Sequence, residues 1–180
     1  MNIETTPLKD VLLLTPAVFE DERGYFFESF NEQKVAEFIN CKFVQDNESM
    51  SQKNVLRGLH FQIPPFAQAK LVRVIQGSVL DVAIDLRQSS PTYGKYFSVV
   101  LSAKNKKQLF IPEGFAHGFL SLEDHTIFSY KCSNYYEKSA EHTILWNDFS
   151  LHIEWNCDQP VLSQKDLIGE TFSTFESPFN

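Results

Sequence analysis

Positive charge is scarce in this sequence, and the shortage bears on the choice of partner. The 180 residues contain 16 Lys and Arg against 23 Asp and Glu, which gives a formal net charge of −7 at pH 7. Proteins that bind nucleic acid in general carry clusters of Lys and Arg, so we expect no nucleic-acid partner. An anionic small ligand stays compatible with the composition, because a pocket can be locally positive on an acidic protein.

Cysteines and long hydrophobic runs are also scarce. Cys41, Cys132 and Cys157 are odd in number and show none of the paired spacings of metal sites, so the sequence predicts reduced structural thiols. No apolar stretch approaches the length of a membrane span. The first ten residues, MNIETTPLKD, lack the basic region and apolar run of a secretion signal. We therefore expect a cytoplasmic protein without a membrane partner.

Hydrophobic and aromatic residues, by contrast, are plentiful. They make up 43% and 14% of the chain, with 17 Phe, which is ample material for a core and argues against disorder. A length of 180 residues suits one domain, or one domain with a tail. No repeat, low-complexity run or linker divides the sequence, so we expect a single domain over residues 1–180.

Short apolar stretches separated by turn residues recur along the chain. Residues 12–30 are typical of strand, turn and strand around DERG, and residues 31–40 predict a short helix with Asn31 as N-cap. Residues 69–87 predict two strands joined in a hairpin at Gln76–Ser78. Many short strands with few helical stretches indicate an all-β sandwich or barrel.

The alternation of the two middle strands predicts a polar pocket. Lys70 lies on one face of its strand, and Asp81 and Asp85 share a face of the next. A two-residue turn between the strands puts all three side chains on the same side of the sheet. If that side lines a barrel of about eight strands, the interior can enclose one small ligand.

The stretch LRGLHFQ, residues 56–62, interrupts an apolar strand with two costly polar groups. Regular pleating would point Arg57 and His60 to opposite faces. Two interpretations stay open on these residues alone. One side chain faces solvent, or Gly58 bends the strand and brings both into one site.

Other polar stretches also have structural interpretations. On composition alone, Asp21–Glu28 is a solvated hairpin turn, and Tyr130 and Tyr136 are core aromatics with their hydroxyl groups at the surface. A lone histidine in a strand is more often structural than catalytic. His60 is harder to dismiss, because an arginine and a lysine lie close to it in the sequence and all three need partners or solvent.

A metal site is a further candidate. Residues 111–119, IPEGFAHGF, are similar to the second motif of the cupin superfamily. Metal-binding cupins have two histidines one residue apart in the first motif, but this sequence has His60, Phe61 and Gln62 there. His60 and His117 alone make a poor site for a transition metal, so we expect a metal-independent site.

Together these stretches resemble one family closely, the dTDP-4-dehydrorhamnose 3,5-epimerases of deoxysugar biosynthesis in the cupin superfamily. The resemblance runs from about residue 5 to about residue 170, and the tail from about residue 167 is less typical. The family patterns D-x-R-G-x-F-x-E, Q-x-N-x-S-x-S…V-L-R-G-L-H-x-Q, Q-A-K-L-V-R-V, D-L-R-x-S-P-T-Y-G, I-P-x-G-F-A-H-G-F, Y-K-x-x-x-Y-Y…E…I-x-W-N-D and L-S-x-K-D are matched at residues 21–28, 45–62, 68–74, 85–94, 111–119, 130–148 and 162–166.

The resemblance implies a cupin-type β-barrel or jelly roll with a few short helices, and a homodimer without metal or organic cofactor. It implies an enzyme that inverts C3 and C5 of dTDP-4-dehydro-6-deoxy-D-glucose to give dTDP-4-dehydro-L-rhamnose. The product would lead to the dTDP-L-rhamnose of cell-surface polysaccharides such as O-antigen. The resemblance also puts Arg57 and His60 in one pocket, so we predict a bulge or sharp bend at Gly58.

Inverting a carbon needs a base on one face and an acid on the other. By the family's pattern His60 is the base, because it titrates near neutral pH, and Tyr130 is the weak acid that reprotonates the carbon. Lys70 is the family's candidate for stabilising the enolate oxygen. Asp166 would orient His60 as in a catalytic dyad. The pattern from Ser163 to Asp166 also fits a capping box, which would make Asp166 structural.

The resemblance assigns the remaining site residues to the sugar nucleotide. Arg23 and Arg57 suit the diphosphate, because guanidinium groups match phosphate oxygens bidentately, and Lys165 adds a cation. The family's other binding residues are Glu28, Gln45 and Asn47 as hydrogen-bonding groups, Tyr136 as the stacking partner of thymine, and His117 and Glu141. In the family, part of this set comes from the partner subunit.

Three other functions stay open on the sequence. A 3-epimerase that inverts only one carbon keeps the same base and acid. A non-catalytic sugar-nucleotide-binding cupin would have lost His60 or Tyr130, and both are present. A metal-dependent cupin dioxygenase or isomerase is the least favoured of the three.

Overall fold

Two β-sheets form the body of the protein. The computed structural model describes residues 1–180, and neighbouring strands within its sheets are antiparallel. One sheet has six strands in the order β1-β2-β10-β7-β12-β5, the other has five in the order β13-β6-β11-β8-β9, and β3 and β4 form a separate hairpin. The elements are β1 (Asn2–Thr5), β2 (Leu12–Thr15), β3 (Val18–Asp21), β4 (Gly24–Phe27), α1 (Glu32–Val35), β5 (Gln45–Ser51), β6 (Leu56–Gln62), β7 (Lys70–Gln76), β8 (Ser78–Asp85), β9 (Tyr96–Ser102), β10 (Gln108–Ile111), β11 (Phe115–Ser121), β12 (Thr126–Cys132), the 3-10 turn η1 (Lys138–Ala140), β13 (Glu141–Thr143) and α2 (Gln164–Leu167).

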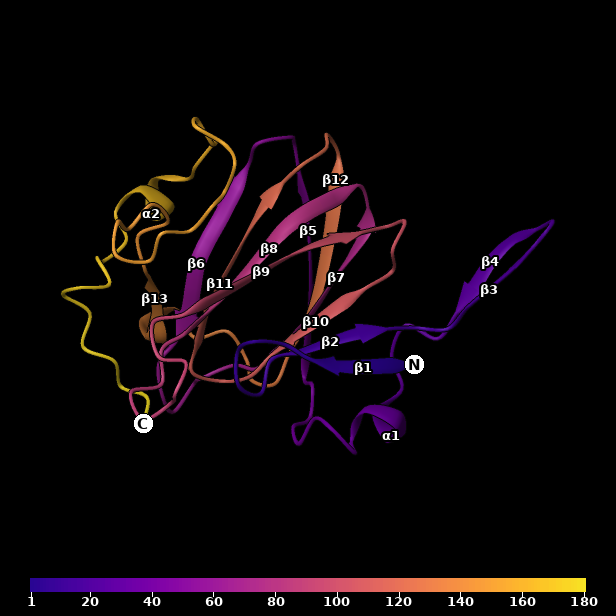
Figure 1. The fold of residues 1–180 in the computed structure, drawn as a ribbon, viewed down its shortest axis with the longest axis horizontal. Helices are drawn as coiled ribbons and strands as arrows, with labels where there is room; N and C mark the ends of the chain where they lie inside the picture. The colour runs from indigo at the N-terminus through magenta and orange to yellow at the C-terminus, as the bar shows by residue number, and fades with distance from the viewer.

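The all-β prediction is confirmed, since the helices are single turns at the periphery. Strands that are adjacent in the sheets are mostly not adjacent in the chain: β10 lies between β2 and β7, and β11 lies between β6 and β8. This order is that of a jelly roll. Figure 1 shows the β3–β4 hairpin projecting from the body, whereas the C-terminal segment (yellow) runs beside the five-stranded sheet.

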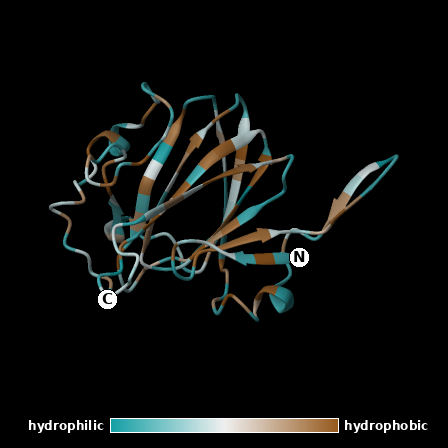
Figure 2. Cartoon of the chain, viewed as in Figure 1, coloured by the Kyte–Doolittle hydropathy of each residue, from teal (hydrophilic) through white to brown (hydrophobic).

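Apolar side chains fill the space between the sheets. Val72 from the six-stranded sheet and Ala83 from the five-stranded sheet are fully buried in one cluster. Phe119 of β11 and Phe128 of β12 stack across this space with ring centroids 4.2 Å apart. Figure 2 shows the corresponding hydrophobic stretches in brown along the strands.

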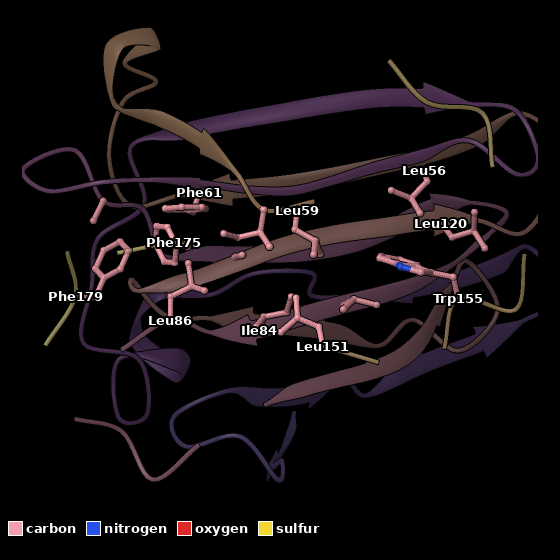
Figure 3. Close-up of a cluster of buried hydrophobic side chains, with 14 residues drawn as sticks. Leu56, Leu59, Phe61, Ile84, Leu86, Leu120, Leu151, Trp155, Phe175 and Phe179 are labelled. Carbon is pink, nitrogen blue, oxygen red and sulfur yellow. The ribbon is translucent and has the colours of Figure 1, made fainter. Parts of the chain in front are cut away.

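The outer face of the five-stranded sheet is buried as well, because the C-terminal segment folds over it. Leu59 of β6 and Ile84 of β8 belong to a cluster that includes Phe175 and Phe179 (Figure 3). The Phe61 ring lies 5.3 Å from that of Phe175 and 6.2 Å from that of Phe179. Burying a phenylalanine stabilises a fold by about 1.5–3 kcal/mol, so the tail that the family resemblance covers poorly contributes to the packed structure.

The hairpin predicted at Gln76–Ser78 is wrong. β7 and β8 do flank Gly77, but β7 belongs to the six-stranded sheet and β8 to the five-stranded sheet. Gly77 has a φ of +77°, and the chain crosses there from one sheet to the other. The residues of a tight turn have the same composition whether the flanking strands pair with each other or with other strands, so the local pattern cannot distinguish the two. Lys70 and Asp81 lie on opposite sheets, not side by side on one.

The helix predicted over residues 31–40 is shorter than expected. Asn31 is the N-cap, and its side chain accepts a hydrogen bond from the Lys34 amide, but α1 ends at Val35. Val35 and Ile39 are buried against the outer face of the six-stranded sheet, where Leu71 belongs to the same cluster. These tertiary contacts hold a single turn in place, which a helix of this length does not achieve alone.

The predicted bulge at Gly58 is confirmed. His117 of β11 faces His60 of β6, but Phe119 faces Arg57, so three residues of β6 span the same distance as two of β11. The extra residue reverses the alternation, and Arg57 and His60 therefore turn to the same cleft. Gly58 has a φ of +136°, and a Cβ atom built on it would lie 2.5 Å from the Cα of Gly118.

Replacing Gly58 is expected to destabilise the fold through both strain and overlap, and Gly24 provides a matched control. Gly24 has a similar φ of +127° but no atom within 4 Å of an added Cβ. Gly24→Ala should therefore cost only the strain of about 1–3 kcal/mol. Gly58→Ala should cost about 1–3 kcal/mol more from overpacking against Gly118, as measured by urea unfolding. Equal losses in the two variants would contradict the close approach.

Candidate active site

A polar cleft lies between the two sheets. It has two adjoining lobes of about 330 Å³ and 310 Å³ that share His60, Lys70, Tyr130 and Glu141. Such volumes are within the range of small-molecule sites. The full set of lining residues is Gln45, Asn47, Ser49, Arg57, His60, Phe61, Gln62, Gln68, Lys70, His117, Phe119, Phe128, Tyr130, Tyr136, Glu141, Ser163, Lys165 and Asp166.

The two sheets contribute different chemical groups to this cleft. His60 comes from β6 of the five-stranded sheet. Tyr130 comes from β12 and Lys70 from β7, which are neighbours in the six-stranded sheet. A ligand that occupies the space shared by the two lobes therefore lies between an imidazole on one sheet and a phenol on the other.

His60 is held by a buried carboxylate from the C-terminal segment. Its Nε2 lies 2.5 Å from Oδ1 of Asp166, a residue that is only 2% exposed. The same Oδ1 accepts a hydrogen bond from the Gly58 amide at 3.4 Å, and Oδ2 accepts one from the Ser163 hydroxyl at 2.6 Å. An ionised carboxylate only accepts, so Nε2 carries the proton and Nδ1 is the basic nitrogen of the neutral ring.

Burial and neighbouring charges give His60 and Asp166 opposite preferences. Burial lowers the pKa of His60 below its ordinary 6.5, and Lys165 and Lys70 lower it further against the raising effect of Asp166. Burial alone would raise the pKa of Asp166, but the hydrogen bonds from His60 and Ser163 outweigh it, and this pKa lies below 3.8. At neutral pH the pair is therefore a neutral imidazole on a carboxylate.

Lys70 and Tyr130 are also desolvated. Burial lowers the pKa of the Lys70 ammonium, whose Nζ donates to the His60 carbonyl at 3.4 Å. Burial raises the pKa of the Tyr130 phenol above its ordinary 10, so the hydroxyl keeps its proton at neutral pH. Cys132, which pairs with Lys70 across the strands, has a pKa raised by burial and is a neutral thiol.

Three cations converge on the cleft of an otherwise acidic chain. Arg57 is fixed by hydrogen bonds from its Nε to the Ser51 hydroxyl at 3.1 Å and from its Nη2 to the Met50 carbonyl at 3.3 Å. Lys165 forms an ion pair with Glu141, and Lys70 is the third cation. The predicted locally positive pocket is present, and its geometry suits an anionic ligand.

Amide and aromatic groups line the second lobe. The Gln45 amide donates to Asn47 Oδ1 at 3.0 Å, and Gln45 Oε1 accepts from the Tyr136 amide at 3.0 Å. The Tyr136 hydroxyl donates to Glu141 at 3.0 Å, while its ring is half exposed. An exposed aromatic ring beside amide groups is a surface on which a planar base can stack.

His117 lies deeper in the cleft. Its Nε2 is 3.0 Å from Oδ2 of Asp81, which is fully buried, so Asp81 is satisfied within the protein. Asp85, predicted on the same face, is not in the cleft. Its carboxylate accepts hydrogen bonds from Arg87, Ser90 and Thr92 in the loop after β8. The prediction that all of these polar side chains line one pocket is therefore wrong for Asp85.

Arg23 and Glu28 are the two predicted binding residues that the fold does not bring to the cleft of their own chain. Arg23 lies at the tip of the projecting β3–β4 hairpin, with its side chain 85% exposed and paired with Asp21. Glu28 pairs with Lys34 at 2.9 Å and accepts a hydrogen bond from Asn31. Neither lines either lobe.

Several cleft residues were missed by sequence reasoning. Phe119 and Phe128 contribute an apolar wall, and they are indistinguishable in sequence from core residues. Gln62 and Gln68 lie inside matched motifs, which was the one signal available for them. Ser163 was interpreted only as a helix cap, yet it contacts the Asp166 carboxylate at the cleft.

The structure contains no group of three or more His, Cys, Asp or Glu side chains arranged to hold a metal ion. No helix in it is long and apolar enough to cross a membrane.

Comparison with known proteins agrees with this geometry. The family model described as dTDP-4-dehydrorhamnose 3,5-epimerase matches residues 5–174. The chain belongs to the dTDP-4-dehydrorhamnose 3,5-epimerase family. Among curated members of the family, it is 57% identical over 169 residues to the Salmonella typhimurium epimerase, covering 92% of each chain. It is 55% identical over 174 residues to the Shigella flexneri epimerase, covering 96% of each chain.

A solved structure of an epimerase shows the same fold. The dTDP-6-deoxy-D-glucose-3,5-epimerase from Legionella pneumophila, crystallised in complex with dTDP-4-keto-L-rhamnose, is 44% identical in sequence. The two structures superpose with a TM-score of 0.93 over 97% of this chain and 94% of the other. The resemblance stated from motifs is thereby confirmed, as is the cupin-type fold.

The balance of charges around His60 can be measured by titration. Its pKa should lie below 6.5 in the wild-type protein, because burial and two lysines oppose protonation. In Asp166→Asn the pKa should fall further, since the carboxylate that raises it is gone. NMR titration of the imidazole resonances measures both values, with the His60 signal assigned by its absence in His60→Asn. An unchanged or higher pKa in Asp166→Asn would contradict the pairing.

Proposed function

We propose that this protein is a dTDP-4-dehydrorhamnose 3,5-epimerase, which inverts C3 and C5 of dTDP-4-dehydro-6-deoxy-D-glucose to give dTDP-4-dehydro-L-rhamnose. Membership of the family supports the substrate and the reaction. The single observation that carries the chemistry is the position of His60 and Tyr130 on opposing sheets, because inversion needs proton removal from one face and proton delivery to the other.

His60 acts as the base in this proposal. The C4 ketone of the substrate acidifies the protons on C3 and C5, because each carbanion is stabilised as an enolate. His60 Nδ1 takes the proton, and the resulting imidazolium is stabilised by Asp166 through Nε2. The lowered pKa of His60 keeps the ring neutral before this step.

Lys70 and Tyr130 complete each inversion. The Lys70 ammonium stabilises the negative charge on the enolate oxygen, a type of contact that contributes about 3–4 kcal/mol in other enzymes. The Tyr130 hydroxyl, protonated at neutral pH because its pKa is raised, delivers a proton to the carbon from the face opposite His60. His60 then returns its proton to solvent and Tyr130 is reprotonated. The substrate's own ketone supplies the electron sink, so we propose no cofactor.

The cations and amides of the cleft hold the nucleotide. Arg57 and Lys165 bind the diphosphate, and Gln45 and Asn47 hydrogen-bond the nucleoside portion. The half-exposed ring of Tyr136 stacks on thymine. His117 and Glu141, which line the same lobes, are the further binding residues.

Deuterium exchange separates the roles of base and acid. In D₂O the wild-type protein should introduce deuterium at both C3 and C5 with inversion, as read by NMR of the product. Tyr130→Phe should still exchange both protons but with retention, because His60 removes and returns them on one face. His60→Asn should do neither, with a loss of about 10²–10⁴-fold in rate.

Several outcomes of this experiment would contradict the proposal. Exchange confined to C3 in the wild-type protein would make it a 3-epimerase. Undiminished exchange in His60→Asn would remove His60 as the base. Dependence of turnover on an added metal ion after exhaustive chelation would contradict the metal-independent mechanism.

We further propose a homodimer in which the β3–β4 hairpin of one subunit completes the cleft of the other. The hairpin carries Arg23 away from its own cleft, and Glu28 follows directly after it. Phe19 and Phe26, opposite each other in the hairpin, are 67% and 70% exposed. A projecting apolar pair of this kind is typical of a surface that a partner covers.

Mixed dimers test whether the cleft is shared. Arg23→Ala and His60→Asn chains should each be impaired at subsaturating substrate as homodimers. Co-expressed in equal amounts, they should regain activity at about a quarter of the sites, because half of the dimers are mixed and each mixed dimer has one complete cleft. An activity equal to the average of the two homodimers would show that Arg23 acts within its own chain or not at all.

The remaining proposals concern the chain as a whole. We propose that residues 1–180 function as a single domain, since the C-terminal segment supplies Asp166 and packs on the five-stranded sheet. A cytoplasmic location and a role in the supply of dTDP-L-rhamnose for surface polysaccharides such as O-antigen follow from the family. The three free cysteines fit a reducing compartment.

A further inference from the structure

Ser163 contacts the Asp166 carboxylate but has no part in the reaction as proposed above. We propose that Ser163 is a positioning residue, whose hydroxyl holds Asp166 in the orientation in which it supports the His60 base. The inference rests on the proposed function, because it assumes that the His60–Asp166 pair takes part in proton transfer.

Each oxygen of the Asp166 carboxylate has its own partner. Oδ1 accepts from His60 Nε2 at 2.5 Å and from the Gly58 amide at 3.4 Å, whereas Oδ2 accepts from Ser163 Oγ at 2.6 Å. Contacts at both ends fix the plane of the carboxylate. Without the Ser163 contact, the group is free to rotate about its Cβ–Cγ bond, and Oδ1 is no longer directed at the imidazole.

The orientation of the Ser163 hydroxyl is itself determined. Its oxygen accepts a hydrogen bond from the Asp166 amide at 3.3 Å. Because that lone pair is occupied, the hydroxyl proton is directed toward Oδ2 of Asp166. The two residues thus form a closed pair of hydrogen bonds, one from backbone to side chain and one between the side chains.

Water cannot substitute for the Ser163 hydroxyl. Asp166 is only 2% exposed, and a buried carboxylate oxygen that loses its donor carries a full desolvation penalty. The Ser163 hydroxyl also helps to hold the pKa of Asp166 below 3.8 against the opposing effect of burial, which keeps the carboxylate ionised.

A purely structural role as the N-cap of α2 makes a different prediction. Glycine replaces serine at an N-cap with a loss of only a few tenths of a kcal/mol, whereas alanine costs about 1 kcal/mol. Ser163→Gly therefore removes the hydroxyl with little damage to the helix end, and Ser163→Thr keeps the hydroxyl. These two variants separate positioning of Asp166 from capping of α2.

The experiment measures kcat and KM for Ser163→Ala, Ser163→Gly and Ser163→Thr. If the hydroxyl positions Asp166, the Ala and Gly variants should both lose about tenfold in kcat, which corresponds to one hydrogen bond to a charged group. Their KM should stay within about twofold, since the substrate is not contacted. Ser163→Thr should recover most of the loss. Wild-type kcat in Ser163→Gly would show that Ser163 is only a cap and overturn the inference.

A double-mutant cycle with Asp166 completes the test. Adding Ser163→Ala to Asp166→Asn should change kcat by less than about twofold, because Ser163 acts only through the carboxylate. A further tenfold loss would show that Ser163 acts elsewhere and would overturn the inference. Wild-type kcat in Asp166→Asn alone would instead overturn the proposed dyad, so the two failures are distinguishable.

Discussion

Gly58 of β6 approaches Gly118 of β11 so closely that a Cβ atom on either glycine would lie within about 3 Å of the other strand's backbone. This contact accommodates the bulge, and the cleft depends on the bulge in two ways. It turns Arg57 and His60, which regular alternation would separate, toward one ligand. It also directs the Gly58 amide at the Asp166 carboxylate that holds His60. A single extra residue in one strand thus aligns a cation, a base and the partner of that base.

Burial then sets the protonation states that the chemistry requires. Desolvation favours the neutral forms of His60 and Tyr130, so one is ready to accept a proton and the other to donate. Asp166 experiences the same desolvation, but its hydrogen bonds with His60 and Ser163 keep it charged. The cleft therefore contains an acid and a base that coexist at neutral pH without neutralising each other. They are separated because they belong to different sheets.

The motifs predicted much of the site, because each places a polar residue at a fixed offset from turns and apolar positions. Their residues from Gln45 to Asp166 do meet in one cleft, although they come from both sheets and the C-terminal segment. Local patterns were less informative about pairing. The turn at Gly77 was interpreted as a hairpin, whereas it carries the chain from one sheet to the other. Asp85 shares the parity of Asp81 but binds loop residues instead.

The sequence by itself determined the all-β class, the family and the set of polar residues that the cleft contains, because alternation and motif spacing are local properties. Its prediction of a bend in LRGLHFQ also held, since only a glycine fits there. Tertiary structure alone decided which strands pair, that the C-terminal segment covers the five-stranded sheet, and that Arg23 lies far from its own cleft. These outcomes depend on contacts between residues distant in the chain, which local patterns do not encode.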